Sequence, residues 1–200
     1  MAMKKVALFL LGISITNIIS AQEKLNLGLK GGLNISNTYN TEAGSDDAKA
    51  GFHLGLLGHV HFTPAVSLQP EIMYSRQGTT SGDVDIHLDY INIPLLVQYN
   101  FDNGFRLQTG PQLGFRTAVS SKLDGREVNA VDRNDFKSTD ISWSLGGGYL
   151  TYSGIGFDIR YNLGLSKIND DPLRAGKTTN RVFQAGIFYL FNHDHKRRSR

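Results

Sequence analysis

The sequence contains no cysteine, a single tryptophan and only five prolines among its 200 residues. The absence of cysteine excludes disulfides, thiol catalysis and thiolate metal sites. Long apolar runs are also absent after the first twenty residues, so no later segment predicts a transmembrane helix. The length favours one domain with a sizeable core over two domains. Glycine, in contrast, is abundant, with 22 residues.

The net charge of +3 comes from the two ends of the chain. Lys4 and Lys5 lie near the start, and four of the last five residues are basic. Without these six residues, 15 basic residues stand against 18 acidic ones, so the body of the chain is slightly acidic. A nucleic-acid-binding surface needs Lys and Arg clustered on the folded domain. We therefore expect no nucleic-acid partner.

The first 21 residues have the three parts of a secretory signal peptide. They comprise a basic start, MAMKK, an apolar stretch, VALFLLGISITNIIS, and a cleavage site, SAQ, after Ala21. The alternative is an N-terminal membrane anchor, but the apolar stretch falls short of the roughly 20 residues that a spanning helix needs. We expect residues 1–21 to be a signal peptide and the mature chain to begin outside the cytoplasm at Gln22.

An alternation of apolar and polar residues recurs eight times after this segment. In the first instance Leu25, Leu27, Leu29, Leu33 and Ile35 share one face, which is typical of a β-strand with two different faces. We expect strands at residues 25–36, 50–62, 66–75, 91–101, 105–117, 141–151, 155–165 and 182–191. Their lengths are near the 9 to 11 residues that a tilted membrane-spanning strand requires.

The connections between the expected strands alternate between short and long. Three are tight turns built from TPA, DNG and SG, which are rich in turn-forming residues. The other four are long and polar, at residues 37–49, 77–87, 118–138 and 166–180. Short periplasmic turns and long external loops are typical of membrane barrels. We predict an all-β, eight-stranded antiparallel up-and-down transmembrane β-barrel over residues 22–191, followed by a basic periplasmic tail at 192–200.

The alternation also fits a soluble lipocalin-like barrel that binds a ligand in an apolar interior. Two features favour the membrane barrel. Many glycines lie on the polar face, where the narrow interior of an eight-stranded barrel leaves little room. Aromatic residues on the apolar face gather near the strand ends, such as Tyr99 and Phe105 at the short turns and Tyr74 and Trp143 at the long loops. Two such girdles are typical of membrane barrels.

Four charged residues on the polar face are expected to meet inside the barrel. Counting strand positions from the short turns places Lys30, Glu71 and Arg160 at similar height, with Asp158 one step below. Two cations and two anions can cancel one another, whereas an unpaired charge there would be costly. We therefore predict a lumen ion-pair network that plugs the barrel.

A second charged pair is expected higher in the lumen. Arg116 and Asp140 face inward on adjacent strands near the long loops. The alternative for all these charges is that they line a narrow channel for small solutes, although side chains nearly fill a barrel of eight strands.

Three histidines share the inner face of one expected strand. His59 and His61 lie roughly 7 Å apart by strand rise, too far to hold one metal ion without help from a neighbouring strand. We predict a hydrogen-bonding role for His53, His59 and His61 and expect neither a metal nor a cofactor.

No constellation for acyl transfer is evident on the outer wall. Such a site needs a serine, a histidine and a carboxylate grouped at the bilayer edge. No histidine falls on the outward face within an expected strand, and His87 is placed in or beside a loop. We therefore expect no enzymatic activity.

Six segments, in this order, resemble the PorT-like porin family of outer-membrane β-barrel domain proteins: GLKGGLNIS, LQPEIMYSRQG, DYINIPLLVQYNF, GPQLGF, DIRYNLGLSKI and FQAGIFYLF. The resemblance covers Leu25 to Phe191. It implies the outer membrane of a Gram-negative cell and insertion by the barrel assembly machinery, and it supplies no catalytic residues.

These observations lead to one functional expectation. We expect a monomer in contact with outer-membrane lipid and lipopolysaccharide that has a structural, adhesive or secretion-accessory role. Secretion-system or surface partners would bind the long loops, of which residues 118–138 form the longest and most charged.

Overall fold

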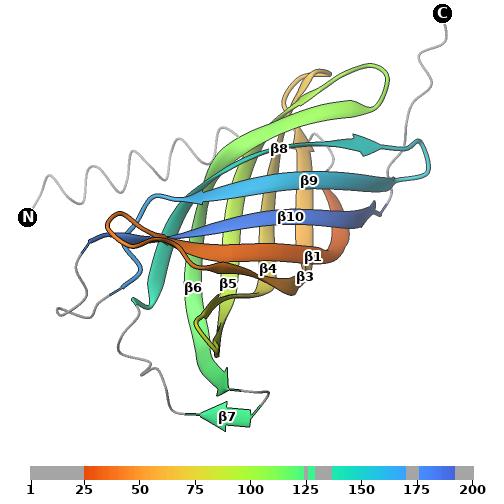
Figure 1. Cartoon of the computed structure of the whole chain (residues 1–200). Coiled ribbons are helices and arrows are strands. Elements are labelled where there is room, and N and C mark those ends of the chain that lie inside the picture. Colours follow the sequence, from red (N-terminus) through yellow and green to blue (C-terminus); the bar gives the residue numbers. More distant parts are fainter. Residues whose placement is uncertain (1–24, 124–125, 129–136, 170–175, 192–200) are drawn as a thin grey trace, which may run out of the picture.

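The computed structural model describes residues 25–123, 126–128, 137–169 and 176–191 (Figure 1). The expected signal peptide at 1–21 and the expected tail at 192–200 lie outside these residues. Among the described residues, no helix is long and apolar enough to cross a membrane. Their regular structure consists of β-strands that belong to one sheet.

Eight long strands form an antiparallel barrel in which neighbours in the sequence are neighbours in space. They are β1 (Asn26–Asn40), β3 (Asp47–His61), β4 (Val66–Ser81), β5 (Val84–Asn100), β6 (Phe105–Leu123), β8 (Thr139–Leu150), β9 (Ile155–Gly164) and β10 (Thr178–Leu190). The barrel closes where β10 pairs with β1, from Leu190 opposite Gly28 to Thr178 opposite Asn40. The predicted eight-stranded up-and-down barrel is confirmed.

The sheet extends further at the long-loop end than the sequence predicts. β4 runs to Ser81 and β5 begins at Val84, so the expected loop at 77–87 is a β-hairpin with a tight turn at Gly82, whose φ is +60°. β6 likewise continues to Leu123 and pairs with the short β7 (Arg126–Val128) (Figure 1). At the end of β1, the two-residue β2 (Gly44–Ser45) folds back in the same way.

Apolar side chains point outward around the middle of the barrel, and polar ones point inward. Leu33 and Leu145 are 70 % and 65 % exposed, whereas Glu71 and Arg160 are each 2 % exposed. This distribution is the reverse of that in a water-soluble protein. The outer surface is therefore suited to lipid hydrocarbon.

Aromatic side chains bound this apolar surface at both ends. At the short-turn end the exposed rings pair as Tyr99 with Phe101, Phe105 with Tyr149, and Tyr189 with Phe191, with centroids 4.9 to 5.5 Å apart. At the long-loop end, Phe52 and Tyr74 are 5.8 Å apart. Such rings favour the boundary between hydrocarbon and water, so they mark the limits of the apolar band.

Beyond Tyr74 the outer face of the sheet becomes polar. Outside, Arg76 donates to both carboxylate oxygens of Asp89, at 2.9 and 3.1 Å, and Lys49 pairs with Asp85 at 2.5 Å. The hydrogen bond from Lys49 holds the pKa of the Asp85 carboxyl below its ordinary value.

On the inner face of the same hairpin, β5 contributes an apolar cluster, whereas β4 keeps the buried polar residues Gln77 and Thr79. Ile86, Leu88 and Tyr90 are buried together, with Val84 and Val119 packed against them. A polar outer face over an apolar inner face is the arrangement of a sheet in water. The polarity of the two faces is thus reversed on β5, and both faces of β4 are polar, so neither segment has the outward apolar residues from which strands were predicted.

Gly156 allows close packing inside the barrel and provides the first test of the fold. A Cβ added there would lie 1.9 Å from the Phe188 ring. We expect Gly156→Ala to lower the free energy of unfolding by about 1–3 kcal/mol, because an overpacked interior must shift. Urea unfolding in lipid vesicles, followed by loss of heat-modifiable mobility on gels, measures the change.

Gly31→Ala is the matched control. A Cβ at Gly31 would meet only the movable Leu54 side chain, at 3.3 Å, and a backbone oxygen at 3.6 Å. Its stability should match that of the wild type, and Phe188→Leu should relieve the defect of Gly156→Ala. Equal stability of Gly156→Ala and wild type would contradict the described packing.

Candidate functional site in the barrel lumen

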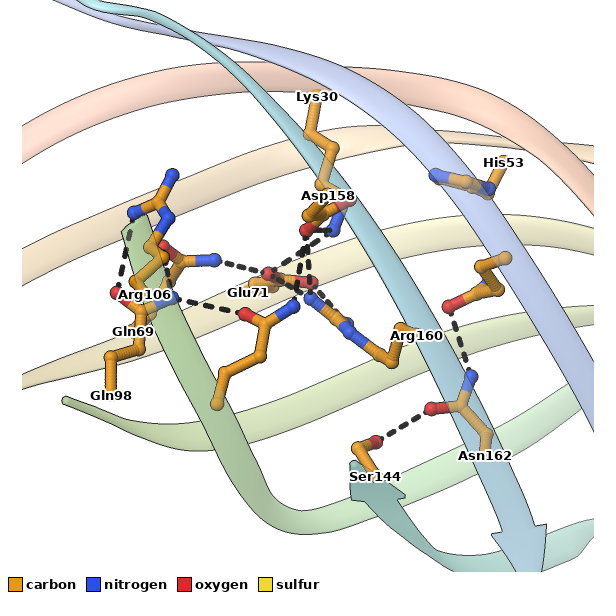
Figure 2. Close-up of polar contacts among 12 residues, drawn as sticks. Lys30, His53, Gln69, Glu71, Gln98, Arg106, Ser144, Asp158, Arg160 and Asn162 are labelled. Atoms are coloured by element: carbon orange, nitrogen blue, oxygen red, sulfur yellow. Dashed lines mark hydrogen bonds and ion pairs between the residues drawn. The ribbon is translucent and has the colours of Figure 1, made fainter. Parts of the chain in front are cut away.

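Four charged side chains from three strands meet in the middle of the lumen (Figure 2). Lys30 comes from β1, Glu71 from β4, and Asp158 and Arg160 from β9. Asp158 and Arg160 share the inner face because alternate residues of a strand point the same way. In the strand order β4 and β9 lie on opposite walls, so contacts between Glu71 and Arg160 span the lumen.

The four charges form one connected network. Arg160 binds Glu71 through two hydrogen bonds, Nη1 to Oε2 at 2.9 Å and Nη2 to Oε1 at 2.8 Å. Lys30 donates to Asp158 and lies 3.7 Å from Glu71, while Arg160 Nη2 lies 3.5 Å from Asp158 Oδ2. The structure thus brings together all four residues singled out from the sequence, and each carboxylate contacts both cations.

Three glutamines complete the hydrogen bonding of the two carboxylates. The Gln98 amide donates to Gln69 and to Gln108, each at 3.0 Å. Gln69 in turn donates to Glu71 at 2.6 Å (Figure 2). Gln108 donates to Asp158 at 3.3 Å. Two chains of amide hydrogen bonds thus start at Gln98, and each ends on a carboxylate. Sequence reasoning missed these glutamines, although all three lie on the polar strand faces that it identified.

Amide and hydroxyl groups join several strands in the next part of the lumen. The side-chain oxygen of Asn34, Oδ1, lies 2.7 Å from His53 Nδ1 and accepts a hydrogen bond from the Gln184 amide at 3.0 Å. Gln184 accepts from Asn162 at 2.9 Å, and Asn162 accepts from Ser144 at 2.7 Å. His53 therefore has the hydrogen-bonding role predicted for it.

At the short-turn end the lumen also contains an apolar cluster. Leu57, Phe188 and Leu190 are buried in one cluster, with Leu150 packed against it. The Arg106 guanidinium lies over the Phe188 ring, 4.2 Å from its centroid. Arg106 also donates to Gln98 in a long hydrogen bond of 3.4 Å. Its charge therefore contacts an aromatic face and an amide, and among the described residues no carboxylate pairs with it.

Among the described residues, no ion pair joins Arg116 to Asp140, the predicted upper pair. Arg116 and Asp140 are both buried on adjacent strands, as expected. Arg116 Nε, however, donates to the Lys137 carbonyl at 3.0 Å, and Asp140 accepts from Ser166 at 2.7 Å. These described contacts direct the two side chains to the loop segments that flank the barrel rim, which strand counting does not place.

His87 is also placed differently by the structure. It lies within β5 rather than in or beside a loop, and it alternates with the buried Ile86 and Leu88, so it faces outward. Burial, together with the nearby Lys49, lowers the pKa of its ring. Its Nδ1 has no hydrogen-bond partner, so among the described residues this outward histidine is not joined into an acyl-transfer triad through that atom.

Comparison with known proteins identifies relatives of this architecture. A family model described as "Outer membrane protein beta-barrel domain" matches residues 20–170. A search of curated proteins finds no significant match.

Among solved structures, Neisserial surface protein A (NspA) is similar with a TM-score of 0.57 and 15% identity, covering 82% of this chain and 97% of NspA. Ail, the attachment invasion locus protein of Yersinia pestis, is similar with a TM-score of 0.52 and 16% identity, covering 84% of this chain and 99% of Ail. At these identities the likeness shows a common fold.

Arg160 and Arg106 are both buried in the lumen, but only Arg160 is bonded to a carboxylate among the described residues, so the two should differ in their effect on stability. Arg160→Met would leave Glu71 buried without its bidentate partner, which we expect to cost about 3–5 kcal/mol in the free energy of unfolding. Arg106→Met removes a buried charge that has no carboxylate partner among the described residues, so it should be neutral or stabilising. Urea unfolding in lipid vesicles compares the two variants, and an equal loss for both would contradict the assignment.

Proposed function

Because the chain belongs to the outer membrane protein β-barrel domain family and lies in the outer membrane, we propose that it is a PorT-like barrel with a closed lumen and no enzymatic activity. Its role is structural, adhesive or secretion-accessory and is exercised at the long-loop end, which faces the outside of the cell. It acts as a monomer and is inserted by the barrel assembly machinery.

The observation that carries this proposal is the bidentate bond between Arg160 and Glu71 across the lumen. Both side chains are no more than 1 % exposed. The interior of an eight-stranded barrel is just wide enough for side chains to fill. The apolar cluster of Leu57, Phe188 and Leu190 and the hydrogen-bonded amides support closure at other heights.

The surface role is supported by the sheet that rises beyond the apolar band. β3, β4 and β5 carry paired charges on its outer face, including Arg76 with Asp89 and Lys49 with Asp85. A rigid scaffold that presents exposed segments is a common arrangement for binding. NspA is described as a surface protein and Ail as an attachment invasion locus protein, so the shared fold has been used for such roles. Lipopolysaccharide would surround this sheet, and secretion-system or surface partners would bind it.

The rival function is a narrow channel for small solutes, which the charges along the lumen favour. Conductance in planar bilayers separates the two. We expect no steady conductance from the wild type, and we expect Glu71→Ala or Arg160→Ala to conduct, because each removes one side of the bond that spans the lumen. Steady wild-type conductance would refute closure.

Lys49→Ala is the control for this measurement. Lys49 also belongs to an ion pair, but it bonds Asp85 outside the barrel. Its removal changes the charge of the protein by the same amount as Arg160→Ala and should leave the lumen closed. Conductance in this variant would show that charge loss in general, rather than opening of the lumen, causes the current.

The proposed orientation is tested by epitope tags at the two ends of the barrel. A tag inserted between Gly82 and Asp83 lies in the turn of the β4–β5 hairpin, and one between Asp102 and Asn103 lies in the short turn between β5 and β6. We expect antibody to label the first tag on intact cells and the second only after the outer membrane is permeabilised. The opposite labelling would reverse the orientation.

A further inference from the structure

Two histidines of β3 approach each other at the short-turn end of the lumen. His59 and His61 are separated by one residue and share the inner face of the strand. His59 is buried, and His61, the last residue of β3, is partly exposed. Their Nε2 atoms lie 3.4 Å apart, much closer than the strand rise alone suggests, because the two rings lean together.

This separation matches that of two imidazoles bound to one metal ion. With Zn–N distances of about 2.0–2.1 Å, tetrahedral geometry places two ligand nitrogens roughly 3.3–3.4 Å apart. The ring centroids lie 4.5 Å apart and the ring planes stand at 84° to one another, so a tilt of the imidazoles is needed to aim both Nε2 lone pairs at one ion. Strand rise separates the two backbone positions by roughly 7 Å, but the two ring nitrogens lie close enough to bind one ion.

We propose that His59 and His61 chelate one divalent transition-metal ion through their Nε2 atoms, with water in the remaining positions. Imidazole donors suit zinc, nickel and copper, and Cu²⁺ binds most tightly in the general order of divalent affinities. A neighbouring pair on one strand loses little freedom on binding. Without metal, one ring donates a hydrogen bond to the other through its Nε2–H. Metal binding therefore requires the donating ring to carry its proton on Nδ1, so that both Nε2 atoms are free to bind the ion.

The surroundings permit a cation at this position. The residues in register with the pair are Asn26 opposite His59 on β1 and Ser67 opposite His61 on β4. Both are uncharged, and both carry oxygen atoms. His61 gives access from the short-turn end, which is the periplasmic end in the proposed orientation. Among the described residues, no group of three or more His, Cys, Asp or Glu side chains is suited to a metal, so His59 and His61 are the two ligands that this part of the chain supplies.

Titration of the full chain with Cu²⁺ in detergent micelles, followed by electron paramagnetic resonance, tests this site. We expect one tightly bound equivalent whose spectrum shows coupling to two imidazole nitrogens. His59→Gln and His61→Gln should each lower Cu²⁺ affinity by at least about tenfold, because loss of an outer-shell partner alone commonly costs 10–100-fold. Heat-modifiable mobility verifies that each variant is folded.

Histidines elsewhere in the chain supply the controls. The double variant His193→Gln/His195→Gln and the single variant His87→Gln should keep the two-nitrogen spectrum and the wild-type affinity. Loss of the spectrum in the double variant, with retention in His59→Gln and His61→Gln, would overturn the proposal.

A second measurement uses only the wild type, in case a variant fails to fold. Diethyl pyrocarbonate modifies accessible imidazoles, and peptide mass spectrometry locates the modification. We expect Zn²⁺ to protect His61 at least about tenfold and to leave His87 unprotected. Equal modification of His61 with and without Zn²⁺ would contradict the chelate.

Discussion

The closure of β10 on β1 is the constraint from which the other features of this molecule follow. Hydrocarbon offers no hydrogen-bond partner, so every backbone N–H and C=O within the apolar band must pair inside the sheet. The register from Gly28 opposite Leu190 to Asn40 opposite Thr178 removes the last open edge. Closure with eight strands, however, leaves a narrow interior. Small residues and close contacts inside the barrel are consequences of that narrowness.

The same narrowness controls how charge is accommodated. A carboxylate in the lumen loses most of its water, so it must find its stabilisation among neighbouring side chains. Glu71 and Asp158 each contact Lys30 and Arg160, and each accepts a hydrogen bond from a glutamine amide. Because several strands contribute to these bonds, the network also ties opposite walls of the barrel together. Stability and the filling of the lumen thus depend on the same side chains.

Much of this arrangement can be predicted from the sequence because a strand has a period of two residues. Alternation gives the inner and outer faces, and counting from the short turns gives height, which is why Lys30 and Arg160 could be matched with partners far away in the chain. Counting gives no side-chain direction. It therefore missed the turn of Arg116 toward the Lys137 carbonyl and the leaning of His59 toward His61. It also missed the β4–β5 hairpin, where the outer face becomes polar on both strands and the apolar residues of β5 point inward.

The change of the outer face from apolar to polar is informative about function because it separates two parts of one continuous sheet. Within the apolar band, the outer face meets lipid and the inner face is occupied by bonded polar groups, so substitutions on the inner face disturb several partners at once. Beyond Tyr74, Ile86 and Leu88 stabilise the sheet from inside, and its outer face carries partly exposed polar groups with local partners such as Lys49 and Asp85. Exposed positions with few partners tolerate substitution at small cost in stability. The fold therefore leaves the outer face of the protruding sheet free to acquire binding specificity while the barrel below it stays unchanged.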